Sequence, residues 1–97
     1  MLVALERFDL RIPGCGSLKE KRHVVKTLTN AIRSKFNVSV AEVDHHDLWQ
    51  RTALAVAVAS GEGYHAKRVL HEVEKLVEGW REVELIDVEL TLHYPEA

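Results

Sequence analysis

The chain has 97 residues, of which 46% are hydrophobic and 29% are charged, a composition typical of a soluble globular domain. The longest apolar run, residues 53–59, is too short to span a bilayer, and the N-terminal residues lack the basic start of a signal peptide. The single cysteine, Cys15, excludes an internal disulfide framework and suits a reducing cytoplasm. We therefore expect one domain over residues 1–97, in the cytoplasm and without a membrane partner.

The net charge of −2 conceals two halves of opposite sign. Residues 1–36 carry eight Lys and Arg against three Asp and Glu, a local charge of +5. Residues 37–97 carry five against twelve, a local charge of −7. The basic half is suited to phosphate groups, and equally to the acidic half of a second copy.

The first predicted element is a strand over residues 2–12, because apolar and charged residues alternate there. Glu6 has the parity of the inward residues Phe8 and Leu10. Since an unpaired buried carboxylate is costly, we expect Glu6 to be paired or solvated. The Pro-Gly pair at positions 13 and 14 ends the strand.

The second predicted element is a helix over residues 17–36, which begins with a capping box formed by Ser17 and Glu20. Apolar residues recur on one side of it at helical spacing: Leu18, Val24, Val25, Leu28, Ala31 and Ile32. The other side is expected to be exposed and carries the basic residues Lys19, Lys21, Arg22, Lys26, Arg33 and Lys35. An ordinary solvated face is one interpretation. The other is salt-sensitive contact with nucleic-acid phosphates, and its candidate residues are Lys19, Lys21, Arg22, Lys26 and Arg33.

The remaining pattern predicts strands over residues 38–43, 52–60 and 83–94 and a helix over residues 64–80. In the last strand, four apolar residues are expected to face inward: Ile86, Val88, Leu90 and Leu92. The order βαββαβ with right-handed crossovers predicts an α+β fold of the ferredoxin-like type. In that sandwich, two helices lie on one face of a four-stranded antiparallel sheet. The fold hosts many functions and identifies none.

The stretch "VAEVDHHDLWQR", residues 40–51, falls in the hairpin between the second and third strands. Its acids and histidines are possible metal ligands, but adjacent residues of an extended strand point to opposite faces, so His45 and His46 do not converge. We therefore predict no metal site and favour a polar hairpin anchored by Leu48 and Trp49. A metal-dependent protein remains an alternative. The candidate interaction residues of this hairpin are Asp44, His45, His46, Asp47, Trp49 and Arg51.

The loop "PGCGSLKEKR" joins a strand to a helix N-terminus, where free amides can hold an anion. Capping alone accounts for Ser17 and Glu20, so a normal turn is the favoured interpretation. Cys15 lies beside the helix start, but no spacing supplies it with a base held by a third group. The sequence thus predicts no catalytic residue and no cofactor.

Self-association is a further hypothesis. Alanines alternate along the third strand, at positions 53, 55, 57 and 59, and give the open face of the sheet a flat surface. A homodimer could form through this face or through the edge of the second strand. A monomer with these alanines beneath longer neighbouring side chains is the alternative.

Three quoted segments carry a resemblance: "IPG" before the first helix, "SLKEKRHVVKTL" within it, and "FNVSVAEVDHHDLWQRTALAVAVAS" after it. With these, nearly the whole chain resembles the bacterial YlxP-like family of small proteins, whose biochemical activity is not settled. Genes of that family often lie among genes for translation initiation and small-subunit maturation. The resemblance therefore implies a role in association with the ribosome or with RNA. Our leading hypothesis is a non-catalytic protein that contacts ribosomal RNA or the small ribosomal subunit. The chain departs from the family at Cys15 and Gly16, where a polar residue is common, so the resemblance implies no role for Cys15.

Overall fold

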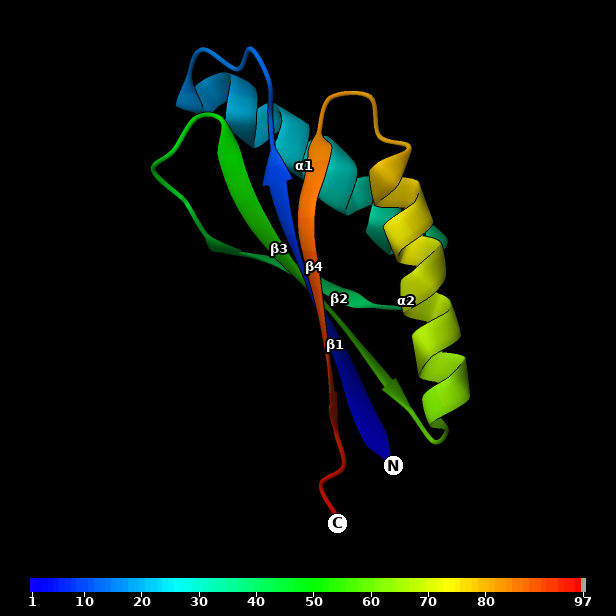
Figure 1. The fold of residues 1–97 in the computed structure, drawn as a ribbon. Coiled ribbons are helices and arrows are strands. Elements are labelled where there is room, and N and C mark those ends of the chain that lie inside the picture. The colour runs from blue at the N-terminus through cyan, green and yellow to red at the C-terminus, as the bar shows by residue number, and fades with distance from the viewer. Residues whose placement is uncertain (97) are drawn as a thin grey trace.

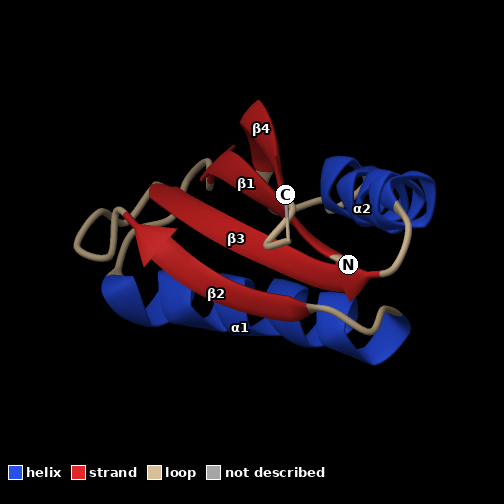
Figure 2. Cartoon of the chain, turned by 90° about the horizontal axis from the view of Figure 1, so that it is seen from below, coloured by secondary structure: helices blue, strands red, loops and turns tan. Residues whose placement is uncertain are grey.

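The computed structural model describes residues 1–96 and confirms the predicted order of elements. They are β1 (Leu2–Arg11), α1 (Leu18–Lys35), β2 (Ser39–Asp44), β3 (Arg51–Ser60), α2 (Gly63–Glu78) and β4 (Glu84–His93). The strands form one antiparallel sheet in the order β2-β3-β1-β4 (Figure 1). Both helices pack on one face of this sheet, so the fold is α+β and ferredoxin-like (Figure 2).

The core lies between the sheet and the helices. Even-numbered residues of β1, such as Phe8 and Leu10, are fully buried, whereas the odd-numbered residues face the open side. The same alternation holds in β3, where Leu54 and Val56 are buried under the helices. Burial of one face of each strand against two amphipathic helices is what the alternating pattern predicts.

The start of α1 is capped almost as the sequence predicts. The Ser17 hydroxyl accepts a hydrogen bond from the Glu20 amide at 3.1 Å. The Glu20 carboxylate accepts one from the Gly16 amide at 2.9 Å, one residue earlier than in a regular capping box. Because Glu20 occupies this amide, the loop presents no open cradle to an anion at Gly16. The thiol of Cys15 is buried and donates to the Ser17 carbonyl at 3.4 Å.

Glu6 is the first correction to the sequence analysis. Its side chain lies on the inner face of β1 and is 7% exposed, and its Oε1 has no hydrogen-bond partner among residues 1–96. The expectation that it is paired or solvated is therefore wrong. Burial, and secondarily the charge of Glu74 in α2, raise the pKa of Glu6 to about 7. Below pH 7 the carboxyl group is therefore mostly protonated, so the position holds no isolated buried charge there.

The inner face of β4 is the second correction. Val88, Leu90 and Leu92 lie opposite inward residues of β1, as predicted, but Leu90 is 43% exposed and Ile86 is 50% exposed. A bulge between the pairs Asp9–Asp87 and Leu10–Leu85 interrupts the register with β1. α1 lies along β2 and β3, and α2 contacts β3, β1 and part of β4, which stands at the far edge of the twisted sheet (Figure 2). Its apolar face is therefore only partly covered.

The two ends of the described chain meet at the end of the sheet far from the β2–β3 hairpin (Figure 1). The amino group of Met1 lies 2.7 Å from the Glu96 carboxylate. Within residues 1–96, neither helix is long and apolar enough to cross a membrane.

Candidate functional site

The basic side chains of α1 divide into two groups that the sequence did not separate. Lys19, Arg22, Lys26, Arg33 and Lys35 are exposed, as predicted, and none of them forms an ion pair with a carboxylate of residues 1–96. The only acid in α1, Glu20, is held at the helix N-terminus by its bond to Gly16. We call these five exposed side chains the basic surface of α1.

Lys21 forms the second group by itself, because its side chain is only 2% exposed. The expectation that it lies on the exposed face is wrong. Its ammonium group lies 3.1 Å from the Glu42 carboxylate in β2 and donates to the backbone carbonyls of His45 and His46. Glu42 in turn accepts a hydrogen bond from the Thr52 hydroxyl at 2.6 Å. A buried lysine is tolerated here because it has a carboxylate partner and two carbonyl acceptors.

A sequence signal for the burial of Lys21 exists. Position 21 lies three residues after Leu18 and three before Val24, and so falls on the spacing of the apolar stripe. A charged residue on such a stripe requires a partner from another element. The identity of that partner, Glu42, depends on the packing of α1 against β2 and cannot be read from spacing.

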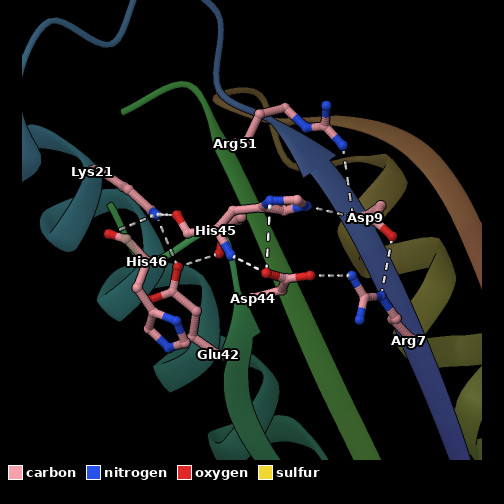
Figure 3. Close-up of polar contacts among 9 residues, drawn as sticks. Arg7, Asp9, Lys21, Glu42, Asp44, His45, His46 and Arg51 are labelled. Carbon is pink, nitrogen blue, oxygen red and sulfur yellow. Dashed lines mark hydrogen bonds and ion pairs between the residues drawn. The ribbon is translucent and has the colours of Figure 1, made fainter. Parts of the chain in front are cut away.

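The β2–β3 hairpin, residues 45–50, is held on both sides of the sheet (Figure 3). On the helix side it is held by Lys21. On the open side, the His45 Nε2 lies 3.3 Å from Asp9, and Arg7 bridges Asp9 and Asp44, with both distances 3.1 Å. The guanidinium of Arg51 lies 3.7 Å from the same Asp9 carboxylate. Four of the six predicted hairpin residues thus take part in these contacts or flank them: Asp44, His45, His46 and Arg51.

These contacts favour the ionised forms of the Asp9 and Asp44 carboxyl groups. Partial burial opposes ionisation of Asp9, but the hydrogen bond and charge of Arg7, together with His45, outweigh it and lower the pKa of Asp9. The backbone amide of His45, at 2.7 Å, and then Arg7 lower the pKa of Asp44. His45 has a positive φ of 61°, which lets one residue turn the chain so that its amide and its ring both face acids.

Trp49 and Leu48 do not anchor the hairpin. They are 51% and 50% exposed, so the expectation that they fix its shape is wrong. The ion pairs around Asp9 and the buried Lys21 hold the hairpin in place instead. The exposed Trp49 remains a candidate interaction residue because a half-exposed indole offers a flat apolar surface to a partner.

A groove of about 390 Å³ separates α1 from β2 and the hairpin. We call it the α1–hairpin groove. Leu18 and Val25 give it apolar walls, and two members of the basic surface, Arg22 and Lys26, line it on the α1 side. The hairpin contributes His46 and Asp47, and the buried pair Lys21–Glu42 also lines it. The groove therefore brings two predicted phosphate-binding residues beside two predicted hairpin residues.

The structure gives the metal alternative no ligand set. His45 turns to Asp9 on the open side of the sheet, whereas His46 lines the α1–hairpin groove (Figure 3). The prediction that the two rings do not converge is confirmed. Within the described part of the chain, no three or more His, Cys, Asp or Glu side chains are placed to hold one metal ion.

Comparisons with known proteins agree with the resemblance seen in the sequence. The family profile described as "Protein of unknown function (DUF503)" matches residues 3–90. The uncharacterized protein YlxP of Bacillus subtilis (strain 168) is 38% identical over 83 residues, which cover 86% of this chain and 90% of that relative. Among solved structures, the de novo designed protein Foldit4 matches 97% of this chain and 98% of its own, with a TM-score of 0.57 at 11% identity. A mutant of SnoaB, a cofactor-independent oxygenase from Streptomyces nogalater, matches 99% of this chain and 93% of its own, with a TM-score of 0.48 at 12% identity. The likeness to Foldit4 bears on the fold alone.

Proposed function

The chain belongs to the DUF503 family, which includes YlxP, and from the geometry of its site we propose that it is a non-catalytic RNA-associated protein of the ribosome or of small-subunit maturation. The basic surface of α1 contacts the phosphate backbone, and the α1–hairpin groove receives the strand beside it. This proposal places the protein in the cytoplasm, where the ribosome is. Self-association is a separate proposal that uses none of these side chains.

The observation that carries the proposal is that the basic surface of α1 has no carboxylate partner within residues 1–96. On the open face of the sheet, by contrast, Arg7, Arg11 and Arg51 all lie beside acids. Cations already paired within the chain gain little from a phosphate, whereas unpaired ones displace the counterions of a nucleic acid on binding. The surface of α1 is therefore the better phosphate site.

The sheet itself is a poor RNA platform. Sheet-type RNA binders stack bases on aromatic side chains of the open face. Among residues 1–96, the open face of β1 and β3 presents Val3, Leu5, alanines and the ion pairs around Asp9, and no Phe, Tyr or Trp of either strand lies on it. Asp87 and Glu89 of β4 add negative charge to the same face. These features support binding at α1 and oppose binding at the sheet.

Charge reversal on α1 tests the proposal. The variant Arg22→Glu/Lys26→Glu changes two exposed side chains that flank the groove. The matched control, Lys67→Glu/Arg68→Glu, makes the same change in charge on two exposed residues of α2. Binding is measured by fluorescence anisotropy with a single-stranded and a double-stranded RNA at low and high salt. Sedimentation of cell extract through a sucrose gradient then tests co-migration with small ribosomal subunits.

We expect the α1 variant to lose binding and co-migration and the α2 variant to retain both. Equal loss in the two variants would show that net charge alone attracts RNA, without a site on α1. Migration of the wild-type protein at the top of the gradient at both salt concentrations would remove the ribosomal proposal.

A further inference from the structure

We propose that β4 pairs with β4 of a second copy about a two-fold axis at Leu90, so that two sheets join into one of eight strands. The proposal begins from the position of β4 at the end of the strand order β2-β3-β1-β4. Its outer edge has no neighbouring strand within residues 1–96. Such an edge exposes backbone donors and acceptors that can pair with another chain.

β4 carries a bulge and two of its three acids, Glu84 and Asp87, near its start, so its edge is least protected from Val88 onward. Its ten residues, ELIDVELTLH, include no Pro, Lys or Arg. Leu90 is 43% exposed on its helix-facing side, and Ile86 is 50% exposed. An unpaired strand with exposed apolar side chains is a surface that a partner can cover in one step, by ladder hydrogen bonds and by apolar contact.

The opposite edge of the sheet, β2, is protected. The Arg33 guanidinium donates to the Val40 carbonyl at 2.8 Å and so occupies an acceptor of this strand. A register shift between Glu42 and Asp44 further disrupts its six residues. We therefore place the contact at β4, and not at the edge of β2 or on the open face, the two dimer surfaces that the sequence suggests.

Charge complementarity selects a second copy as the occupant. In an antiparallel pair about a two-fold axis, side chains directly opposite each other have the same parity. With the axis at Leu90, Asp87 lies opposite His93 of the second copy, and Glu89 lies opposite its Thr91. On the helix-facing side, Leu90 meets its own copy and Val88 meets Leu92.

Neighbouring registers of the β4–β4 pair place acids opposite each other or pair fewer residues. An axis at Val88 places Asp87 opposite Glu89, and an axis at Glu89 places two glutamates opposite each other. An axis at Thr91 avoids such acid pairs but pairs only residues 89–93 of β4, whereas the axis at Leu90 pairs residues 87–93. The register centred on Leu90 is the longest of these that sets no acid opposite another.

Three side chains of nearly equal exposure make a matched test, one on each candidate surface. They are Leu90 in β4, Leu5 on the open face and Val43 in β2, which are 43%, 42% and 44% exposed. Each is changed to Arg, and circular dichroism checks that each variant is folded. The mass of the untagged protein is measured by sedimentation equilibrium over a dilution series from micromolar to near-millimolar concentration.

We expect the wild-type mass to be twice 11.0 kDa and the Leu90→Arg mass to fall to 11.0 kDa, with Leu5→Arg and Val43→Arg unchanged. A wild-type monomer at every concentration would overturn the proposal. Loss of the dimer in Leu5→Arg or Val43→Arg, with Leu90→Arg still dimeric, would assign the contact to the open face or to β2 and would overturn it too.

The register has its own test. His93→Asp places Asp87 opposite an acid, so we expect this variant to lose the dimer. The double variant Asp87→His/His93→Asp exchanges the two partners, and we expect it to restore the dimer. A His93→Asp variant as dimeric as wild type would contradict the axis at Leu90.

Discussion

The ammonium group of Lys21 in α1 lies 3.1 Å from the Glu42 carboxylate in β2, and the lysine side chain is only 2% exposed. This pair joins the helix that carries the basic surface to the strand that leads into the hairpin. Lys21 also donates to the backbone carbonyls of His45 and His46, so one side chain joins the α1 side of the α1–hairpin groove to the hairpin side. The residue that sequence reasoning placed among the phosphate contacts is thus a structural element of the groove.

Replacement of Lys21 by Met should destabilise the fold by roughly 3 kcal/mol, because a partly buried carboxylate and two carbonyls lose their partner. Urea unfolding followed by circular dichroism measures the change. Lys26→Met is the control, since an exposed lysine of the same helix should change stability by less than about 0.5 kcal/mol. Equal stability of Lys21→Met and wild type would show that the buried pair contributes nothing.

The carboxyl group of Glu6 should make stability fall as pH rises from about 4.5 to about 7. Its pKa is raised from 4.5 to about 7 in the folded protein, so above pH 4.5 the unfolded chain loses a proton that the folded chain keeps. The resulting loss is complete above pH 7 and amounts to about 3 kcal/mol. Glu6→Gln keeps the shape of the side chain but has no carboxyl proton to lose. The variant should be more stable than wild type at pH 8 but not at pH 4.

Chemical denaturation at several pH values tests this difference. Asp9 and Asp44 have lowered pKa values, and their contribution is lost as pH falls, but it is common to both proteins. The difference between Glu6→Gln and wild type therefore isolates Glu6. A difference that does not vary with pH would mean that Glu6 titrates as an ordinary surface acid.

Trp49→Ala should cost less than about 1 kcal/mol of stability, because the indole is 51% exposed. Phe8→Ala, at a fully buried position, should cost about 3–5 kcal/mol. Both are measured by thermal or urea unfolding. If Trp49→Ala weakens RNA binding while stability is retained, Trp49 contacts the partner; a cost close to that of Phe8→Ala would restore Trp49 as the anchor of the hairpin.

The salt dependence of RNA binding should become shallower when α1 contacts are removed. Each phosphate contact contributes about 0.7 to the magnitude of the slope of log K against log salt concentration for a single strand. Removal of two such contacts in Arg22→Ala/Lys26→Ala should therefore reduce the magnitude of the slope by about 1.4. Titrations at four or more salt concentrations give the slope. An unchanged slope with weaker binding would indicate that the two side chains shape the groove without touching phosphate.

The elements of the fold were predictable because local patterns decide them. Alternation along β1 and β3 and helical spacing along α1 persist whatever the partners are. The errors concern burial, which depends on partners from distant segments. Glu6 lies near Glu74 of α2 and Lys21 is paired by β2, while β4 stands at the edge of the sheet, where α2 covers its inner face only in part.

The candidate site was predicted in part for the same reason. Exposure of Arg22 and Lys26 follows from helix geometry. The divergence of His45 and His46 was predicted from strand geometry, but both residues lie after the end of β2, where the positive φ of His45 turns the chain. The role of Asp9 as a shared acceptor for Arg7, His45 and Arg51 required three strands to be placed side by side. No spacing along the chain contains that information.

Lys21 holds the hairpin through backbone carbonyls, which every amino acid possesses. Position 46 can therefore change its side chain without loosening the loop, although that side chain lines the groove. A library randomised at 46 should yield folded proteins for nearly all residues, and one randomised at 21 should yield few. Substitutions at position 46 can thus change which ligand the groove prefers, while the fold of the hairpin stays the same.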